Sequence, residues 1–439
     1  MKRHPKALLG LCSTMIWERF AFYGIRAMLV IYMVEQTLNG GFGWSNSDAI
    51  SLYSTFMGIA WCTPLLGGYL ADRYLGQRLS IWIGGILMAS GQFLLAFPGM
   101  GPFFAGLSLV ALGNGFFKPC LTSMVGGLYG GQDEQRRNSA YSIFYMGINL
   151  GIFLAPLICG WAQLTFGFGI AFAATGLGMV LAMGIYTLAR RKLPEGLGLR
   201  PRPLAHNKAR RQPLSQAEKL RIASIVILCV FFIAWYASME QAGGLMAVFA
   251  QQFTDRSIGS WEIPTAWFLA LPPFFMVAFA PVLSKLWNRL SLKGKEPSTC
   301  FKMAFGCFLS AAAFALMIVA TIVAGDGKVA SHWHIWFYAL LGASEMCVIP
   351  VLWATISRVA PAKYLSFLMA MALAAIGLGS KVAGIVGAYI DALGPLQLFW
   401  GIGCAMAILG ILMILVNQQI TRLQESGLQP KPEESLSTR

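Results

Sequence analysis

Long apolar stretches separated by short polar segments recur along the whole chain of 439 residues. Each stretch holds about 18 or more mostly apolar residues, which is enough to cross roughly 30 Å of hydrocarbon as an α-helix. The pattern predicts an all-α integral membrane protein with twelve transmembrane helices. The expected spans are residues 8–36, 46–71, 79–97, 102–128, 139–160, 169–190, 220–250, 263–288, 299–324, 333–358, 364–390 and 396–420.

The composition agrees with a membrane protein and excludes a soluble globular one. Hydrophobic residues make up 57% of the chain and charged residues only 12%, whereas a soluble domain has about 25% charged residues. The sequence has no HExxH, no GxSxG and no glycine loop before Lys-Ser/Thr, the motifs of common hydrolases and phosphate binders. We therefore expect no enzyme and no metal site. His332 and His334 are expected to be interfacial or solvated, because no third ligand is evident nearby.

The net charge of +15 could indicate a nucleic-acid partner. The positions of the basic residues along the chain decide whether the charge reflects such a partner or the membrane topology. With the N-terminus in the cytoplasm, 27 of the 33 Lys and Arg residues fall in cytoplasmic segments. The outer loops hold only Arg256 and Lys328. This asymmetry is the positive-inside rule. It predicts an inner-membrane protein with both termini in the cytoplasm, some attraction for membrane lipid, and no nucleic-acid partner.

A basic, proline-containing segment divides the spans into two groups of six. We expect an N-terminal six-helix bundle at residues 1–190, a cytoplasmic linker at 191–219, a C-terminal bundle at 220–420 and a cytoplasmic tail at 421–439. This layout is that of the major facilitator fold, in which two halves rock around a site near the bilayer midplane. Hydropathy alone does not distinguish it from other folds with twelve helices. A monomer suffices for this architecture.

Seven charged residues fall inside the predicted spans, away from their ends. Each costs about 2.5–3.5 kcal/mol on insertion scales, so such residues usually face a pathway or a partner. In the first span Arg26 follows Arg19 by seven residues and Glu18 by eight, which gives this helix one polar face. A structural ion pair is the alternative for any single one of them. The seven residues are Glu18, Arg19, Arg26, Lys118, Glu240, Glu345 and Lys381.

Motifs around these charges resemble those of the proton-dependent oligopeptide transporters, a family of the major facilitator superfamily. The first span reads WERFAFYGIRA at 17–27, and the second-to-third-span connection reads GGYLADRYLGQR at 67–78. The remaining motifs are GNGFFKPCLTSMVGGLY at 113–129, FYMGINLGIFLAP at 144–156, EQAG at 240–243, APVLSKLWNRL at 280–290, EPST at 296–299 and SEMCVIP at 344–350. Their order and spacing match the family over most of the chain.

The resemblance implies roles for individual residues in a transporter of peptides or peptide-like solutes, with protons as the coupling ion and no other cofactor. Arg26 and Glu240 would form an outer gate that closes as an ion pair. Asp72, Arg73 and Arg78 would tie the cytoplasmic ends of helices together, and a solvated loop that only sets topology is the alternative. The proton-coupling residues would be Glu18, Arg19, Lys118 and Glu345. The substrate-binding residues would be Tyr23, Arg26, Trp61, Lys118, Asn149, Gln241, Glu345 and Ala372.

Several positions depart from the family pattern. Met15 replaces the first Glu of the first-span motif, Phe22 replaces a Tyr, Ala372 replaces a Trp, and Lys381 adds a cation in the eleventh span. If Met15 and Lys381 face the cavity, the interior becomes more positive, and Ala372 leaves room for a larger solute. One hypothesis is therefore a bulkier anionic peptide-like metabolite such as a siderophore, with altered proton coupling. Met15 as an apolar packing residue, and Lys381 snorkelling or paired with Asp391, remain open.

Two further alternatives concern the direction and the class of activity. An exporter or facilitator would use the same fold, and the direction of flux cannot be deduced from the sequence. A sensor that binds solute without moving it would need a signalling domain. The longest non-membrane segments are the linker between Arg191 and Glu218 and the tail from Thr421, and both are too short to fold alone.

Overall fold

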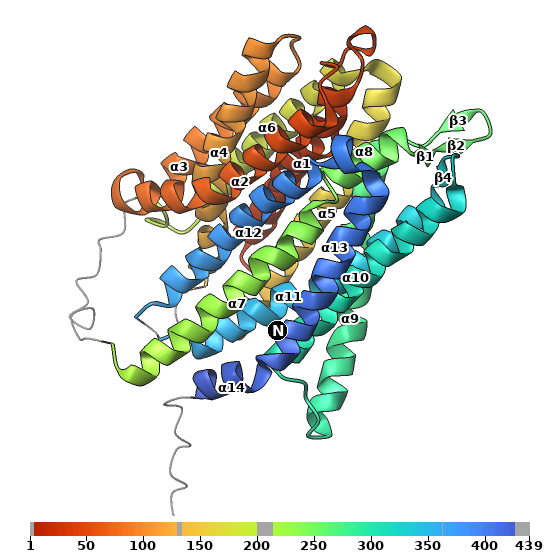
Figure 1. Ribbon diagram of the computed structural model, residues 1–439. Coiled ribbons are helices and arrows are strands. Elements are labelled where there is room, and N and C mark those ends of the chain that lie inside the picture. The colour runs from red at the N-terminus through yellow and green to blue at the C-terminus, as the bar shows by residue number, and fades with distance from the viewer. Residues whose placement is uncertain (1–3, 130–133, 200–213, 362, 426–439) are drawn as a thin grey trace, which may run out of the picture.

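The computed structural model describes residues 4–129, 134–199, 214–361 and 363–425. Part of the predicted linker, residues 200–213, and most of the predicted tail, residues 426–439, lie outside the described residues. The described part is a bundle of long helices (Figure 1). It confirms the all-α major facilitator fold with two six-helix halves.

The first half comprises six long helices. They are α1 (Lys6–Val34), α2 (Asn46–Leu70), α3 (Gln77–Leu95), α4 (Met100–Gly127), α5 (Glu134–Phe166) and α6 (Phe168–Ala189). Eleven helical segments of the described chain are long and apolar enough to cross a membrane, and α1 is not among them. This 29-residue helix carries Glu18, Arg19 and Arg26, packs against α5 and α6, and is largely buried. It is the twelfth long helix.

The second half follows the same plan with shorter additions. It comprises α7 (Gln216–Glu240), α8 (Leu245–Gln252), a 3₁₀ helix (Thr265–Ala270), α9 (Leu271–Leu292), α10 (Thr299–Ala324), α11 (His332–Val359), α12 (Leu365–Gly387), α13 (Ile390–Leu415) and α14 (Asn417–Glu425). The predicted seventh span at 220–250 is two helices, because α7 ends at Glu240 and α8 starts at Leu245. The predicted twelfth span starts too late, since α13 begins at Ile390 and kinks at Gly394, whose φ is +76°.

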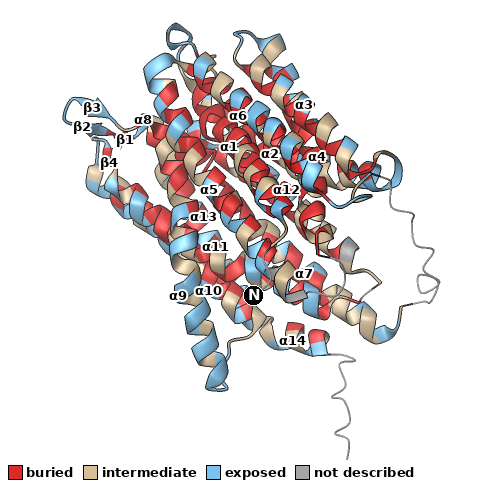
Figure 2. Cartoon of the chain, turned by 180° about the vertical axis from the view of Figure 1, so that it is seen from behind, coloured by how far each residue is buried: buried red, intermediate tan, exposed pale blue. Residues whose placement is uncertain are grey.

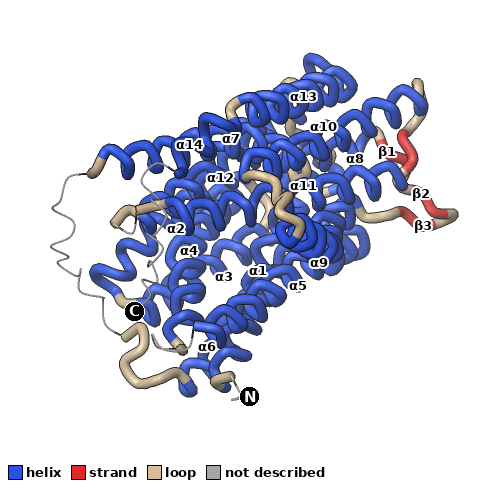
Figure 3. Tube along the Cα trace, turned by 90° about the horizontal axis from the view of Figure 1, so that it is seen from below, coloured by secondary structure: helices blue, strands red, loops and turns tan. Residues whose placement is uncertain are grey.

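The two ends of the bundle differ in their loops. Four short strands lie at one end: β1 (Thr254–Asp255) pairs with β4 (Val329–Ala330), and β2 (Ser257–Ile258) pairs with β3 (Trp261–Glu262). We call this the hairpin end. The segment after α6, residues 193–199, and the start of α7 lie at the opposite end, the linker end (Figure 3).

Glycines bring the helices of the first half into backbone contact. A Cβ atom on Gly67 of α2 would lie 2.2 Å from the carbonyl oxygen of Gly115 of α4. A Cβ on Gly84 of α3 would lie 2.6 Å from the carbonyl oxygen of Gly113. Small residues allow this close approach in membranes, where packing stabilises helix pairs more than the hydrophobic effect does. The first half is therefore tightly packed around α4.

The second half is looser around α9. Only Pro273 and Met276 of this helix are buried, and both lie in its first two turns. From Val277 to Leu292 no residue is buried, and this part of α9 extends away from its neighbours toward the linker end (Figures 1 and 2). A cleft is left between α9, α10 and α11 as a result.

The halves meet along α2 and α12 with small residues at the contact. A Cβ on Gly377 would lie 2.9 Å from the carbonyl oxygen of Gly58, and a Cβ on Gly58 would lie 3.2 Å from that of Gly377. Ser54 of α2 similarly packs on Gly384 of α12. The two halves therefore touch backbone to backbone at this seam.

Candidate substrate cavity

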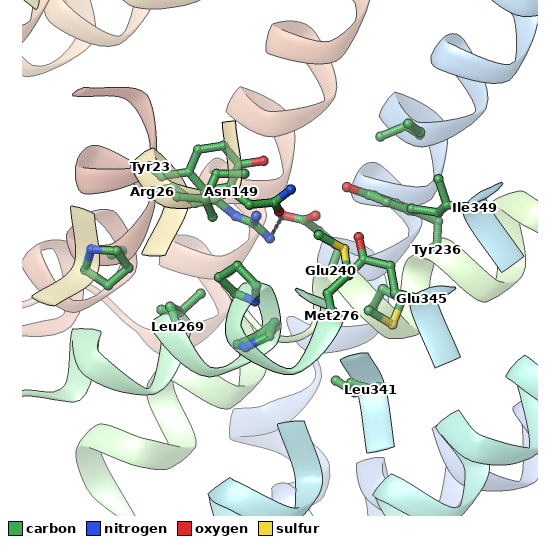
Figure 4. A pocket seen from close by; sticks show the side chains of 18 of the residues that line it. Tyr23, Arg26, Asn149, Tyr236, Glu240, Leu269, Met276, Leu341, Glu345 and Ile349 are labelled. Carbon is green, nitrogen blue, oxygen red and sulfur yellow. Dashed lines mark hydrogen bonds and ion pairs between the residues drawn. The ribbon is translucent and has the colours of Figure 1, made fainter. Parts of the chain in front are cut away.

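A cavity of about 910 Å³ lies between the two halves (Figure 4). Helices α1, α2 and α5 contribute one wall, and α7, α9, α11 and α12 contribute most of the other. Its lining combines many apolar side chains with a few charged and polar ones, as is usual for small-molecule sites. The lining residues are Tyr23, Arg26, Ala27, Trp61, Asn149, Ile152, Pro156, Trp235, Tyr236, Met239, Glu240, Ala242, Leu269, Pro272, Pro273, Met276, Leu341, Glu345, Ile349 and Ile376.

One part of the cavity wall is a three-residue network that joins the halves. The Arg26 guanidinium contacts the Glu240 carboxylate at 3.2 Å, and its Nε donates to the Tyr53 hydroxyl at 2.9 Å. Tyr53 in turn donates to Glu240 at 2.6 Å. Charge-assisted hydrogen bonds of this kind are stronger than neutral ones. The Arg26–Glu240 pair expected from the sequence is therefore present, with Tyr53 as a third member.

Glu345 lies on the opposite side of the cavity from Arg26 (Figure 4). Within the described chain its carboxylate has no hydrogen-bond or ion-pair partner. Asn149 also lines the cavity, and its Oδ1 is buried without a hydrogen-bond partner while its Nδ2 donates to the Tyr145 carbonyl. A buried polar group without a partner is costly, so these oxygens are suited to a ligand that donates hydrogen bonds.

A second ionic group lies deeper in the first half. Glu18 and Arg19 form a buried ion pair, and Arg19 also approaches Asn114 at 3.4 Å. The Lys118 ammonium sits 3.8 Å from the centroid of the Trp61 ring, a cation–π contact. Trp61 lines the cavity, whereas Glu18, Arg19 and Lys118 do not. Of the residues expected to couple protons, Glu18, Arg19 and Lys118 are thus near the cavity wall but separated from its interior, whereas Glu345 lines it.

Several predicted substrate contacts lie elsewhere. Lys118 is covered by Trp61, and Gln241 donates to the Ala383 carbonyl at 3.0 Å on the α12 side, so neither lines the cavity. Ala372 is fully buried in helix packing and also lies outside it. The expected enlargement of the pocket at Ala372 is therefore wrong for this structure.

The residues expected to make the cavity more positive do not face it either. Met15 and Phe22 are buried among apolar side chains, which agrees with the packing alternative for Met15. Lys381 is exposed at the seam and donates to the Thr55 hydroxyl at 2.7 Å. It does not pair with Asp391, which accepts from Asn46 and from the Ser47 backbone instead.

The connection after α2 was expected to tie the cytoplasmic ends of helices together, and one of its three predicted residues does so. Arg78 donates to the carbonyl oxygens of Leu197 and Pro194 at 2.7 and 3.1 Å, which ties α3 to the segment after α6. Arg73 donates instead to Tyr69, one turn earlier in its own segment. No hydrogen bond or ion pair of Asp72 occurs in the described chain. Arg78 is thus the residue that joins two elements here.

His334 is buried, contrary to the expectation of an interfacial or solvated side chain. Its Nε2 lies 2.8 Å from the Thr254 hydroxyl, and its ring stacks on Phe268. The described residues contain no cluster of three His, Cys, Asp or Glu side chains that could hold a metal ion.

Sequence reasoning missed Tyr53, Trp235 and Tyr236 as parts of this site. Tyr53 precedes Trp61 by eight residues, a spacing that places both on one face of α2. That spacing could have identified Tyr53. Trp235 donates to the Ser344 hydroxyl, which links α7 to α11 behind the cavity.

Comparison with known proteins identifies the family. The Major Facilitator Superfamily model matches residues 19–380. The chain is 30% identical to the uncharacterized transporter YclF of Bacillus subtilis, over 97% of this chain and 96% of the relative. It is 31% identical to the peptide transporter YePEPT of Yersinia enterocolitica, over 96% of each chain.

Solved structures agree. A peptide transporter POT in complex with sulfate has a TM-score of 0.89 and 28% identity, with 96% of each chain covered. A mutant of a peptide transporter POT in complex with alafosfalin has a TM-score of 0.88 and the same identity and coverage. The chain therefore belongs to the major facilitator superfamily and, within it, to the proton-dependent oligopeptide transporters, a family of secondary transporters.

Proposed function

We propose that this protein imports short peptides across the inner membrane together with protons. It works as a monomer, and the linker end and both termini face the cytoplasm. Three features support the proposal: the cavity with opposite charges on facing walls, the basic residues at the linker end, and the relatives named as peptide transporters.

The observation that carries the proposal is the lone carboxylate of Glu345 in a cavity whose other wall holds Arg26. A zwitterionic peptide has an ammonium group for Glu345 and Asn149 and a carboxylate for Arg26 and Tyr23. Recognition of the two termini leaves the side chains free to vary, because both ends are bound by charge-assisted hydrogen bonds. The cavity therefore selects for the peptide backbone.

The same carboxylate gives a way to couple protons. A carboxylate in a low-dielectric site is stabilised either by a nearby cation or by a proton. Glu345 therefore carries a proton when no peptide ammonium is present, and the Glu18–Arg19 pair next to Lys118 is a second place where protonation would release a cation. A peptide ammonium that binds at Glu345 displaces this proton, and the Glu18–Arg19 pair can hold it, so that peptide and proton cross together.

The Arg26–Glu240 pair serves as the gate toward the hairpin end. It joins α1 to α7, and further contacts between the halves accompany it there: Asn46 donates to Asp391 at 2.7 Å and Gln251 donates to Glu35 at 3.1 Å. Opening on that side has to break this pair. A substrate carboxylate that competes for Arg26 would weaken it, which links peptide binding to the opening of the gate.

The bulky siderophore hypothesis is not carried forward. It depended on Met15, Lys381 and Ala372 facing the cavity, and none of the three lines it.

The test is transport by the Glu345→Gln variant in proteoliposomes. Replacing the carboxylate removes the proton-binding group, so peptide accumulation driven by a proton gradient should fall to the level without a gradient. The loss of one charge-assisted bond of about 1.5–3 kcal/mol should also weaken peptide binding by roughly 10- to 100-fold. Counterflow at high peptide concentration should persist.

Glu195→Gln is the matched control, because Glu195 is an exposed carboxylate in the segment after α6. It should accumulate peptide as the wild type does. Gradient-driven accumulation that survives in Glu345→Gln would remove Glu345 from proton coupling. Failure of the wild type to exchange any di- or tripeptide would reject the proposed substrate.

A further inference from the structure

A second cavity, of about 1290 Å³, lies at the linker end and is separate from the substrate cavity. Its lining comes only from α9, α10, α11 and the connection between α9 and α10. It shares no lining residue with the substrate cavity. Since no residue of the first half lines it, the cavity is a cleft within the second half and does not lie on the path between the halves.

The cleft lies beside the part of α9 from Val277 to Leu292, in which no residue is buried. The α9 wall of the cleft is largely apolar, since Ala280, Leu283 and Trp287 line it. In a membrane such a surface is stable only against lipid chains or another helix. The cleft is thus open to an apolar chain along α9.

Basic groups occupy the rim of the cleft. Lys302 pairs with Glu296 at 2.6 Å and lies 5.5 Å from the centroid of the Trp287 ring. That pairing holds the pKa of Glu296 below its usual range, so the pair contributes no net charge near neutral pH. Arg358 also lines the cleft, is exposed, and makes no hydrogen bond or ion pair within the described chain. One guanidinium is therefore left to bind an anion.

The surroundings add to this positive charge. Arg289 and Lys293 lie at the end of α9, and Lys295 follows in the connection to α10. None of the three lines the cleft. They raise the electrostatic potential at its mouth, which attracts anionic groups at the surface of a membrane.

We propose that this cleft is a binding site for an anionic phospholipid of the cytoplasmic leaflet. The phosphate is held by Arg358, whose planar fork matches phosphate oxygens. Asn288 and Ser284 offer polar contacts to the glycerol region, and one acyl chain follows the apolar face of α9. The combination of an apolar wall with one unpaired cation favours a lipid over a soluble anion, which would leave the wall uncovered.

The experiment measures lipid binding to the purified full-length protein, without transport. Native mass spectrometry with phosphatidylglycerol and phosphatidylcholine, matched in acyl chains, should show a saturable preference for phosphatidylglycerol. Arg358→Gln should weaken phosphatidylglycerol binding by about tenfold or more. Lys293→Gln is the matched control, since it removes an exposed charge at the same end outside the cleft, and it should leave binding within about twofold.

A second variant tests the shape of the cleft and does not depend on correct folding of the Arg358→Gln variant. Ser284→Phe places a large side chain in the cleft and leaves Arg358 intact, and it should also abolish the preference for phosphatidylglycerol. Full binding by either cleft variant would overturn the proposal, as would an equal loss in Lys293→Gln, which would indicate a diffuse basic surface. Equal stabilisation by inorganic phosphate, or displacement of the lipid by a dipeptide, would assign the cleft to a soluble anion or to the substrate and also overturn it.

Discussion

The two halves share one plan but differ in charge and in packing. The first half contributes the cations near the cavity, Arg26 and Lys118, and packs its helices around α4 through glycines. The second half contributes the carboxylates Glu240 and Glu345, and its helix α9 is unpacked over most of its length. A solute between the halves therefore meets Arg26 on the closely packed side and Glu240 and Glu345 on the other.

This difference indicates which half binds the substrate carboxylate and which half adjusts to the rest of the ligand. A rigid cationic wall fixes the position of a carboxylate, whereas the opposite wall can adjust to ligands of different length. The second half also contains Glu345, the carboxylate that we propose takes up a proton. Four variants test whether charge and packing are divided in this way.

The largest effect is expected for Arg26→Gln. The substitution removes the cation of the first wall and leaves Glu240 buried with only Tyr53 as a partner, and breaking a buried pair costs about 3–5 kcal/mol. Uptake of labelled dipeptide should fall by more than about 100-fold, with a large rise in KM for any residual activity. Uptake assays at several peptide concentrations measure both quantities.

The double variant Arg26→Glu with Glu240→Arg sharpens the comparison. It restores the ion pair and so should recover the thermal stability lost in Arg26→Gln. Uptake should stay low because the cation now belongs to the other wall. Recovery of full uptake would mean that only the pair matters, and the assignment of the cation to the first half would be wrong.

A smaller effect, on stability alone, is expected for Gly67→Ala. The added methyl group would lie 2.2 Å from the backbone oxygen of Gly115, so α2 and α4 have to separate. Overpacking of this kind costs about 1–3 kcal/mol, which thermal unfolding in detergent should show as a lower Tm. Gly101→Ala at the start of α4 is the control, since no atom lies within 4 Å of its added Cβ. An unchanged Tm for Gly67→Ala would show that the first half is not the rigid one.

The smallest effect is expected for Lys381→Met. This change removes one hydrogen bond to Thr55, worth about 0.5–1.5 kcal/mol, and no charge from the cavity lining. Uptake of neutral and acidic dipeptides should each stay within about threefold of the wild type. A selective loss of acidic-dipeptide uptake, measured by competition, would show that Lys381 acts as a cation in the wall formed by the second half. The division of charge between the two halves would then be wrong.

Much of the fold could be predicted from the sequence, because apolar length and the placement of Lys and Arg follow directly from the membrane. The break between α7 and α8 was not expected, since the residues around Gly243 and Gly244 keep the stretch apolar and hydropathy does not detect a local unwinding. The unpacked half of α9 was missed for a similar reason. Its sequence is as apolar as a packed helix, and only its neighbours decide whether it is covered.

The site was predicted in part. Charges inside spans identified Arg26, Glu240 and Glu345, because an ionised group in lipid needs a partner or a cavity. The orientation of an uncharged residue carries no such penalty, so Ala372 was assigned to the cavity although it packs between helices. Lys381 shows the limit of the argument, since a hydroxyl at the seam satisfied it as well as a cavity would.

The contact between Gly58 and Gly377 has a mechanical consequence. Where the backbones of two glycines touch, no side chain of either glycine has to be repacked when the helices move against each other. We therefore expect the halves to rock about this seam. The free-energy cost of switching then lies mostly in breaking the ion pairs and hydrogen bonds that join the halves at the hairpin end.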